Sequence, residues 1–323
     1  MIKTPKFWKS SNFISELLLP FSVIYFIAIR IKYFLGSSKK PYKSSIPVIC
    51  IGNPTSGGAG KTPTAIALSK LLLNNNKKIC FVSKGYKGNF KKTIKVDTNT
   101  HTPHEVGDEA ILLAQHAPCF VCNNREQGIK AAEEDGAEII ILDDGLQDRT
   151  IIKDVTISVI DGSYGLGNHL LIPAGPLRDR LDISLNHTDI VLLIGDDNND
   201  VKKEVTEEIP IITAKMISKE VPDKSLQYMA FAGIGMPDKF FFHLESIGLE
   251  LKRRCPFPDH HVYSDRQIKS LLNDAALAES RLITTEKDAI KIDKKYLKDI
   301  TVYSADLSFD DEEYIITYFK DYI

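Results

Sequence analysis

A glycine-rich segment between a short apolar run and a helix-like segment constrains this chain more than any other feature. The apolar run is Ile46–Cys50, the segment Ile51–Pro63 reads IGNPTSGGAGKTP, and Ala65–Leu73 has the character of a helix. In such an arrangement, glycines let backbone N–H groups surround an oxyanion that also faces the positive end of the helix dipole. Lys61 would reach the outer phosphates and the Thr62 hydroxyl would ligate Mg²⁺. The pattern predicts a strand, a loop and a helix that bind a nucleoside triphosphate.

The loop departs from the usual phosphate-loop pattern at two positions. Thr55 stands where the strict pattern has glycine, and Ser56 stands where dimeric cargo-positioning ATPases carry a signature lysine. The absence of that lysine argues against this class of ATPase. We predict that the nucleotide contacts come from one continuous stretch, which consists of Thr55, Ser56, Gly57, Gly58, Ala59, Gly60, Lys61 and Thr62.

Beyond this loop, strand-like and helix-like segments alternate along the chain. Alternation of this kind predicts an α/β fold, in which helices cover both faces of a parallel sheet and ligands bind at the carboxyl ends of the strands. Segment 196–209 is polar and rich in charge, so we expect it to be a linker. The predicted organisation is a membrane-associating helix within 1–44, a P-loop domain over 45–195 and a second, smaller α/β domain over 210–323.

The expected elements can be named by their residue ranges. In the first domain we expect strands at Ile79–Ser83, Phe120–Cys122, Glu138–Asp143, Val155–Ile160 and Ile190–Ile194, and helices at Thr62–Leu73, Asp108–Gln115 and Arg125–Glu134. In the second domain we expect strands at Tyr228–Ala232, Leu249–Arg253, Leu282–Thr284 and Ile300–Tyr303, and helices at Asp238–Ser246, Asp265–Ala278 and Glu312–Phe319.

The N-terminal 44 residues form a basic and apolar arm on an otherwise acidic chain. They hold eight basic residues and one acidic residue, Glu16, although the whole chain has a net charge of −2. The thirteen residues Leu17–Ile29 carry no charge, which is shorter than the roughly 20 apolar residues of a membrane-spanning helix. With aromatic residues and lysines around it, this run predicts a helix that lies in the membrane interface on anionic lipid. A buried core helix, a spanning helix and a signal peptide are the alternatives.

Composition narrows the class of protein further. The chain is 43% hydrophobic and 26% charged, as in soluble globular proteins, and its acidic body argues against nucleic-acid binding. Cys119 and Cys122 have C-x-x-C spacing, but the sequence lacks the second pair that a zinc site of this kind needs. We therefore interpret the five cysteines as small buried side chains of a reduced, cytoplasmic body.

Two pairs of acidic residues are candidates for the chemistry. Asp143 and Asp144 end the apolar run Ile139–Leu142, and in P-loop proteins an acid at this place binds Mg²⁺ directly or through water. Capping of the following loop is the alternative. Asp108 and Glu109 open a predicted helix, where acids complement the helix dipole. They also suit a base near the γ-phosphate that orients or deprotonates an acceptor hydroxyl.

Three more loops carry polar residues of interest. Pro173–Arg178 is a stiff loop that presents Arg178, whose guanidinium could hold a phosphate through two parallel hydrogen bonds. His260 and His261 are adjacent, so they point apart and suit a shared metal poorly; they are either solvated or catalytic. Thr285–Asp288 weakly resembles the base-reading motif of GTPases, which keeps a GTPase as one alternative.

Taken together, these motifs resemble one family, the tetraacyldisaccharide 4′-kinases, which are the lipid A kinases of Gram-negative bacteria. The combination of motifs is specific, although each piece alone is not. The matching stretches follow the expected order along nearly the whole chain: Ser56–Pro63, Ser83–Tyr86, Val106–Glu109, Asp143–Gln147, Gly165–Leu171, Pro173–Arg178, Gly233–Pro237 with Phe240 and Phe241, Asp259–His261 and Thr285–Asp288.

The resemblance implies a reaction and a location. ATP would phosphorylate the 4′-hydroxyl of a tetraacylated glucosamine disaccharide 1-phosphate, with Mg²⁺ as the cofactor. The enzyme would be peripheral or monotopic on the cytoplasmic face of the inner membrane, and no obligate protein partner is evident. A membrane-positioned regulatory NTPase is the main alternative, and a nucleotide-gated scaffold without enzymatic activity is another.

The resemblance also implies roles for individual residues. Asp108 would be the catalytic base and would act with a histidine, for which we favour His260 over His261. The expected catalytic residues are Asp108, His260, Lys61 and Arg178, and the expected metal ligands are Thr62, Glu109, Asp143 and Asp144.

One position departs from the family pattern. The family usually has histidine directly after D-D-G-x-Q, and this chain has Asp148 there. We expect the additional negative charge to weaken nucleotide binding unless Arg149 or Mg²⁺ compensates for it.

Overall fold

The computed structural model describes residues 5–36, 40–320 and 322, and it divides into two compact units. The P-loop unit comprises Pro5–Met216 and Leu307–Ile323, and the second unit comprises Ile217–Asp306. Among the described residues, the second unit is therefore one continuous piece of chain, whereas the P-loop unit is assembled from two pieces.

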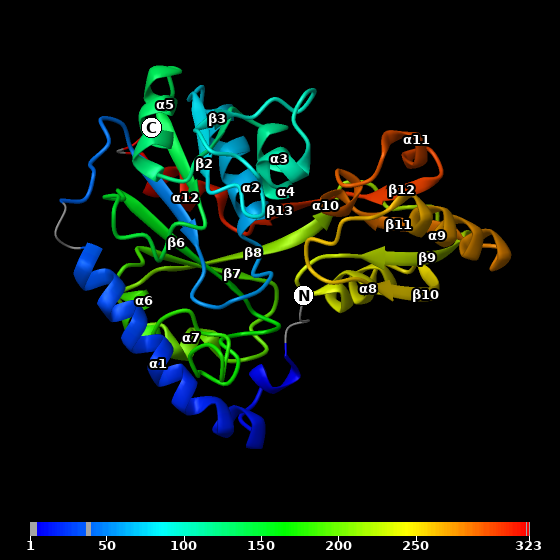
Figure 1. Cartoon of the computed structure of the whole chain (residues 1–323), viewed down its shortest axis with the longest axis horizontal. Helices are drawn as coiled ribbons and strands as arrows, with labels where there is room; N and C mark the ends of the chain where they lie inside the picture. Colours follow the sequence, from blue (N-terminus) through cyan, green and yellow to red (C-terminus); the bar gives the residue numbers. More distant parts are fainter. Residues whose placement is uncertain (1–4, 37–39, 321, 323) are drawn as a thin grey trace. The chain divides into compact units, whose positions relative to one another are not determined.

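The P-loop unit is built on a nine-stranded sheet with the strand order β13-β8-β7-β6-β1-β5-β2-β4-β3. Of these strands, Figure 1 labels β2, β3, β6, β7, β8 and β13. The pairs from β4 to β8 along this order are parallel, and the short β3 pairs with β4 in the antiparallel direction. The strands are β1 (Val48–Gly52), β2 (Ile79–Ser83), β3 (Ile94–Lys95), β4 (Cys119–Val121), β5 (Ile139–Asp143), β6 (Val155–Asp161), β7 (Ile190–Ile194), β8 (Ile211–Ser218) and β13 (Ala305–Phe309).

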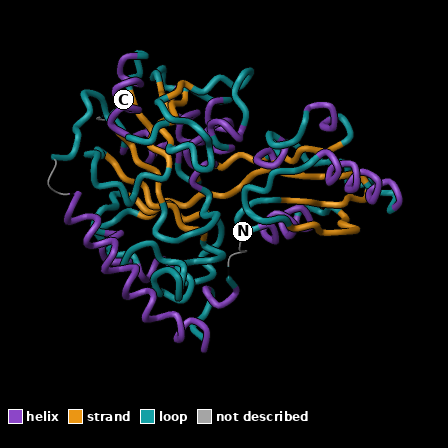
Figure 2. Tube along the Cα trace, viewed as in Figure 1, coloured by secondary structure: helices purple, strands orange, loops and turns teal. Residues whose placement is uncertain are grey.

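Helices cover both faces of this sheet, and Figure 2 shows them flanking the strands. On one face, Ile129 and Ala132 of α5 pack against alternate residues of β1 and β5, such as Cys50 and Leu142. Because side chains alternate along a strand, Ile49 points to the opposite face. The helices are α1 (Phe13–Gly36), α2 (Lys61–Asn74), α3 (Pro103–Val106), α4 (Asp108–Ala114), α5 (Arg125–Glu134), α6 (Leu181–Leu185), α7 (Val201–Glu204) and α12 (Glu312–Tyr318), with a 3₁₀ turn at Lys6–Trp8.

Glycine is required at the start of α2, where the chain turns sharply out of the phosphate loop. Gly60 directly precedes the helix and has a φ of 94°, which side chains rarely tolerate. A Cβ at this position would also lie 2.5 Å from Cδ1 of Ile194 on β7. The loop conformation therefore depends on this glycine.

The second unit is a smaller α/β sheet with four parallel strands in the order β10-β9-β11-β12. One face is covered by α8, through Phe240, Phe241 and Leu244, and the other by α9, through Ile268 and Leu271. The elements are β9 (Gln227–Ala232), α8 (Pro237–Ser246), β10 (Glu250–Pro256), α9 (Asp265–Leu277), β11 (Arg281–Thr285), α10 (Glu286–Ala289), α11 (Lys294–Leu297) and β12 (Ile300–Tyr303).

The predicted α/β fold class is confirmed, but the domain boundaries differ from the predicted ones. Segment 196–209 is not a bare linker, because it contains α7, and Val201 and Val205 are buried in the core beside β7. Residues 307–323 do not belong to the second unit, because β13 joins the edge of the large sheet and Phe319 is buried. Helix α7 was not predicted because its segment is mostly polar. The place of β13 was not predicted because it depends on pairing between segments that are distant in sequence.

The N-terminal helix is longer than the uncharged run from which it was predicted. It extends over Phe13–Gly36, and Phe13–Leu35 is long and apolar enough to cross a membrane by length and composition, with only 11% of its most apolar window buried. Asn12 begins the helix, because its Oδ1 accepts hydrogen bonds from the N–H groups of Ile14 and Ser15 at 3.0 and 3.1 Å.

Candidate active site

The strand register brings the predicted site motifs of the P-loop unit to one edge of its sheet. β1 pairs with β5 in parallel so that Ile51 lies opposite Asp143, which places the phosphate loop beside the Asp143–Asp144 pair. β2 lies on the other side of β5, so the Ser83–Lys84 turn comes to the same edge. This carboxyl edge of a parallel sheet is where ligands bind in α/β proteins.

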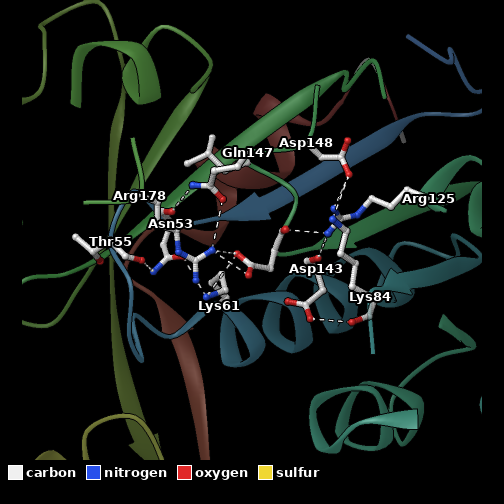
Figure 3. A network of polar contacts seen from close by, with 12 residues as sticks. Asn53, Thr55, Lys61, Lys84, Arg125, Asp143, Gln147, Asp148 and Arg178 are labelled. Atoms are coloured by element: carbon white, nitrogen blue, oxygen red, sulfur yellow. Dashed lines mark hydrogen bonds and ion pairs between the residues drawn. The ribbon is translucent and has the colours of Figure 1, made fainter. Parts of the chain in front are cut away.

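Lys61 connects the phosphate loop to the acidic pair (Figure 3). Its ammonium donates to Oδ1 of Asn53 at 3.1 Å and lies 3.7 Å from a carboxylate oxygen of Asp144. Thr62, the next residue, is buried at the first turn of α2. Lys61 is thus held near the carboxylate and close to the helix end that would face a phosphate.

The beginning of the phosphate loop is joined to a second loop, Leu171–Asp179, which we call the Pro-Ala-Gly loop. Thr55 forms a β-bridge with Leu177, and the N–H of Ser56 donates to the carbonyl of Pro176 at 2.7 Å. The N–H of Arg178 donates to the carbonyl of Pro54 at 2.9 Å. These backbone bonds explain how Arg178, distant in sequence, is delivered to the phosphate loop.

Asp144 is the ionised member of the acidic pair. One guanidinium nitrogen of Arg178 donates to both of its carboxylate oxygens, at 2.7 and 3.0 Å, and contacts Gln147 at 3.4 Å. Although burial acts in the opposite direction, Lys61 and Arg178 hold the pKa of Asp144 well below its usual range. Asp144 therefore carries a negative charge at neutral pH and fixes two cations in place.

Asp143 has the opposite environment. It is 2% exposed, and burial raises its pKa to about 7, with the negative charges of Glu109 and Asp144 acting in the same direction. Ser83 donates to its Oδ2 at 3.2 Å, while its buried Oδ1 has no hydrogen-bond partner. A buried, unpaired carboxylate oxygen among other negative charges is suited to a cation, and oxygen is the ligand that Mg²⁺ prefers.

The acidic residues do not by themselves form a closed metal cage. Among the described residues, no group of three His, Cys, Asp or Glu side chains is arranged to hold a metal ion. This arrangement suits Mg²⁺, which usually keeps several waters and takes its other ligands from phosphate oxygens. Asp143 thus fits the predicted metal site by geometry and charge.

Asp108 and Glu109 open α4, as predicted, after a tight turn at Gly107. Gly107 has a φ of 90°, and Asp108 is 5% exposed, with its carboxylate accepting from the N–H of Glu109 at 2.9 Å. Glu109 is near enough to the sheet edge for its charge to act on Asp143. Glu109 of the second predicted acidic pair therefore interacts electrostatically with the first pair, and a shared site stays a prediction.

Arg125 organises the backbone of the acidic pair, a role that the sequence analysis missed. This side chain at the start of α5 is 3% exposed, and it donates to the carbonyls of Asp143 at 2.7 Å and Asp144 at 2.8 Å. Its other terminal nitrogen donates to Asp148 at 2.8 Å (Figure 3). The sequence signal was a basic residue at the first position of the predicted helix Arg125–Glu134, where an acid is the usual complement of the helix dipole.

This contact answers the question raised by Asp148. The compensating cation is Arg125, with Lys84 at 3.8 Å, whereas the guanidinium of Arg149 lies over the ring of Tyr33. Although burial opposes it, hydrogen bonds from Thr150 and the charge of Arg125 hold the pKa of Asp148 well below its usual range. Arg149, one of the two compensators considered, therefore does not take this position, and Arg125 does.

His260 and His261 belong to the second unit, and their side chains have different neighbours. His260 has a φ of 57°, and its Nε2 lies 3.6 Å from a carboxylate oxygen of Asp259. His261 stacks on Phe257 with ring centroids 4.7 Å apart, and burial lowers its pKa. The carboxylate beside His260 makes it the better candidate for proton chemistry.

Thr285–Asp288 has a structural role in the second unit. Asp288 is fully buried and accepts hydrogen bonds from the N–H of Gly233 at 3.0 and 3.1 Å and from the hydroxyl of Tyr263 at 2.9 Å. The ammonium of Lys291 lies 2.8 Å away. A carboxylate so fully engaged is not placed to read a guanine base, which disfavours the GTPase alternative.

Comparison with known proteins places these motifs in one family. The profile of the family described as LpxK, tetraacyldisaccharide-1-P 4'-kinase, matches residues 14–322. A tetraacyldisaccharide 4'-kinase of Paramagnetospirillum magneticum is 40% identical over 312 residues, covering 96% of this chain and 95% of the relative. One of Parvibaculum lavamentivorans is 39% identical over 300 residues, covering 90% of this chain and 87% of the relative.

A solved structure has the same fold. The crystal structure described as the "apo" form of LpxK from Aquifex aeolicus in complex with ATP aligns with a TM-score of 0.77 and 29% sequence identity. The alignment covers 96% of this chain and 99% of that one. The resemblance inferred from the sequence motifs is thus confirmed over almost the full length, and this chain belongs to the tetraacyldisaccharide 4′-kinase family.

Proposed function

We propose that this protein transfers the γ-phosphate of ATP to the 4′-hydroxyl of a tetraacylated glucosamine disaccharide 1-phosphate in lipid A biosynthesis. Family membership over residues 14–322 supports the substrates, and the site supports the type of reaction. The observation that carries the proposal is the convergence of Lys61, Arg178 and Asp144 beside the phosphate loop. Phosphoryl transfer requires positioning and charge neutralisation more than a protein nucleophile, and this cluster provides both.

In the proposed mechanism, the phosphate loop holds the nucleotide. Backbone N–H groups within residues 55–62 and the N-terminus of α2 bind the phosphates, and Lys61 neutralises charge on the outer ones. Arg178 rotates from Asp144 towards the transferred phosphate or donates to both at once. The same residues stabilise the charge that spreads over the γ-phosphate oxygens in the transition state.

The metal would be held chiefly at Asp143, the member of the acidic pair that Arg178 does not contact. Asp143, with its unpaired Oδ1, is the principal ligand in this proposal, and Asp144, Glu109 and the Thr62 hydroxyl complete the set directly or through water. When bound there, Mg²⁺ would supply positive charge that offsets the negative charge of the nucleotide phosphates. Binding of a cation would also bring Asp143 into its ionised form.

Asp108 is the proposed general base. It takes the proton of the 4′-hydroxyl as the sugar oxygen bonds to the γ-phosphorus and the bond from that phosphorus to the β–γ bridging oxygen breaks, which releases ADP. Its position at the start of α4, beside Glu109 of the metal site, supports this role. The role of His260 as its partner stays a prediction, as does the choice of His260 over His261.

The proposed location is the cytoplasmic face of the inner membrane, with α1 lying in the interface. The helix is too firmly attached to the P-loop unit to be surrounded by lipid, because residues from Ser22 to Tyr33 hydrogen-bond to its loops. Lipid would contact the other side, where apolar side chains such as Phe21 and Ile24 are more than half exposed. A glycolipid acceptor is brought to the site in this way.

A transfer experiment tests the proposal directly. The purified full chain is incubated with Mg²⁺, ATP labelled at the γ-position and tetraacyldisaccharide 1-phosphate in mixed micelles. We expect label in the lipid product at the 4′-position. Label released only as inorganic phosphate would instead support a regulatory NTPase, and no consumption of ATP would support a nucleotide-gated scaffold.

A further inference from the structure

The side of α1 that packs against the P-loop unit carries a set of polar residues. Ser15 and Ser22 are buried, and Tyr25, Arg30 and Tyr33 follow at helical spacing and are partly buried. The rest of the helix exposes large apolar residues, among them Phe13, Leu17, Phe21, Ile24, Ile27 and Ile31. A helix that served only as an anchor would need no such set of hydrogen-bonding groups on its protein-facing side.

The first of these groups holds the Pro-Ala-Gly loop. The Ser22 hydroxyl donates to the carbonyl of Leu171 at 2.7 Å and accepts from the N–H of Ala174 at 3.1 Å. The Trp8 indole, just before α1, donates to the carbonyl of Pro173 at 2.9 Å. The loop is therefore bonded to the phosphate loop on one side and to the N-terminal segment on the other.

The next two groups reach the end of that loop, where Arg178 lies. The Tyr25 hydroxyl donates to the carbonyl of Arg178 at 3.1 Å. The Arg30 guanidinium pairs with Asp179, whose side chain is 2% exposed. The Arg30 side chain is 35% exposed, so only the carboxylate is buried, and loss of Arg30 would leave that buried charge without its cation. The main chain that carries Arg178 is thus fixed to α1 at two consecutive residues.

The last group reaches the loop that follows the acidic pair. The Tyr33 hydroxyl donates to the carbonyl of Gln147 at 3.2 Å, and its ring contacts the guanidinium groups of Arg30 and Arg149. Gln147 in turn donates to the carbonyl of Asn53 at 3.1 Å. One helix therefore holds the backbone on both sides of the Arg178–Asp144 pair.

We infer that Tyr25 and Tyr33 are positioning residues for phosphoryl transfer, so that α1 is part of the catalytic frame and not only a membrane anchor. The inference rests on the proposed function, because it concerns the reaction that Arg178 assists. Each tyrosine acts through a backbone carbonyl and does not itself touch the reacting atoms. The hydrogen bonds of Tyr25 and Tyr33 would then link the position of α1 at the membrane to the alignment of Arg178 with Asp144.

The variant Tyr25→Phe/Tyr33→Phe tests this inference, because it removes the two hydroxyls and keeps both rings. The full chain is assayed with a water-soluble, short-acyl analogue of the disaccharide 1-phosphate, so that membrane binding does not limit the rate. We expect kcat to fall at least fivefold, the Kd for Mg–ATP to change less than threefold, and binding to anionic vesicles to stay as in the wild type. Amide exchange around Arg178 should become faster.

The controls separate the possible failures. Tyr314→Phe makes the same chemical change at an exposed position on α12 and should leave kcat within twofold of the wild type. If the double variant keeps its kcat, or loses nucleotide affinity in the same proportion as kcat, the inference is overturned. A wild type that never phosphorylates the analogue or the natural acceptor would contradict the proposed function instead.

Discussion

At the scale of single residues, Asp143 and Asp144 show how adjacent carboxylates acquire opposite character. Asp144 has cations on two sides, from Lys61 and Arg178, and its pKa is low. Asp143 is buried with an unpaired oxygen, and its pKa is raised to about 7. One is fixed as a counter-ion and the other is left available for a metal. Pairs of titratable groups driven apart in this way are typical of active sites.

The raised pKa of Asp143 predicts a specific pH dependence of stability. In the unfolded chain Asp143 ionises near pH 4, whereas in the folded protein without metal it keeps its proton up to about pH 7. The folded state therefore loses stability as the pH rises from about 4 to 7, because ionisation is favoured only in the unfolded chain. Asp143→Asn removes this loss, and we expect the variant to be the more stable protein above pH 7, by up to a few kcal/mol.

Urea unfolding with a chelator present, at several pH values between 5 and 8, measures this difference. The advantage of Asp143→Asn should grow with pH up to about 7 and then level off. Saturating Mg–ATP should remove the greater stability of Asp143→Asn, because the wild type binds Mg²⁺ through Asp143 in our proposal. Stability curves for the two proteins that run parallel across this range would show that Asp143 is ionised throughout.

Asp108 is expected to act on the rate and not on nucleotide binding. Asp108→Ala removes the proposed base, so kcat should fall by roughly 10²–10⁴-fold while the Kd for Mg–ATP changes little. Glu109→Gln is the matched neighbour, and it should raise the Mg²⁺ concentration needed for half-maximal rate. Steady-state kinetics combined with nucleotide titration distinguish the two, and a large loss of nucleotide affinity in Asp108→Ala would assign this residue to the metal site.

Asp148 is expected to support the acidic pair through Arg125. In Asp148→Asn the buried guanidinium loses its counter-ion, so the free energy of unfolding should fall by about 1–3 kcal/mol. Lys84→Met removes the other cation near Asp148. The Lys84 side chain is 56% exposed, and its Nζ lies 3.8 Å from a carboxylate oxygen of Asp148. That control should cost less than about 1 kcal/mol. Equal effects of the two substitutions on urea unfolding would contradict a special role for Arg125.

At the scale of elements, most of the helices and strands were predictable from apolar runs and alternation. β2, β7, β12 and α5 have the predicted bounds, because each is a compact apolar run or a regular helix between clear breaks. β8 and β13 were missed, because both are partly polar and each becomes a strand by pairing within the large sheet, β8 beside β7 and β13 beside β8. The part played by Arg125 was missed for the same reason, because it depends on strand order.

The site could be predicted as a set of residues but not as a set of contacts. The phosphate loop, Asp143 and Arg178 each stand in motifs whose chemistry is visible in the sequence. Nothing in the sequence indicates that Arg178 pairs with Asp144, or that the hydroxyls on α1 hold the two loops. Those contacts depend on backbone paths between distant segments.

The exposed side of α1 is expected to carry membrane binding separately from its packed side. Ile24→Ser/Ile27→Ser places two hydroxyls on the exposed apolar side, where these residues are 63% and 51% exposed, and leaves the packed side unchanged. Since each buried methylene group contributes about 0.8 kcal/mol, co-sedimentation with anionic vesicles should weaken at least tenfold. The apparent KM for bilayer-embedded acceptor should rise, with thermal stability unaffected. Unchanged co-sedimentation would mean that lipid binds elsewhere.

At the scale of the whole molecule, the two compact units have separate cores, and they differ in how many pieces of chain form each unit. Over the described part of the chain, the second unit is continuous and buries residues such as Phe241 between its sheet and α8. The P-loop unit needs the C-terminal piece, in which Phe319 is 1% exposed. Two α/β units were predicted from the sequence. The return of residues 307–323 to the P-loop unit was not, because the sequence of helix α12 does not indicate which of the two sheets it packs against.

This organisation predicts that matched core substitutions affect different units. Phe319→Ala and Phe241→Ala both remove a phenyl ring that is almost fully buried, and each should cost about 3–5 kcal/mol in its own unit. Mg–ATP, which binds the P-loop unit in our proposal, stabilises by mass action only the state in which its site is folded. We therefore expect Mg–ATP to restore the unfolding midpoint of the Phe319→Ala transition far more than that of Phe241→Ala. The measurement is urea unfolding followed by hydrogen exchange, which assigns each transition to β1 and β5 or to β9 and β11. If Phe319→Ala loosened β9 and β11 as much as β1 and β5, residues 307–323 would not belong energetically to the P-loop unit.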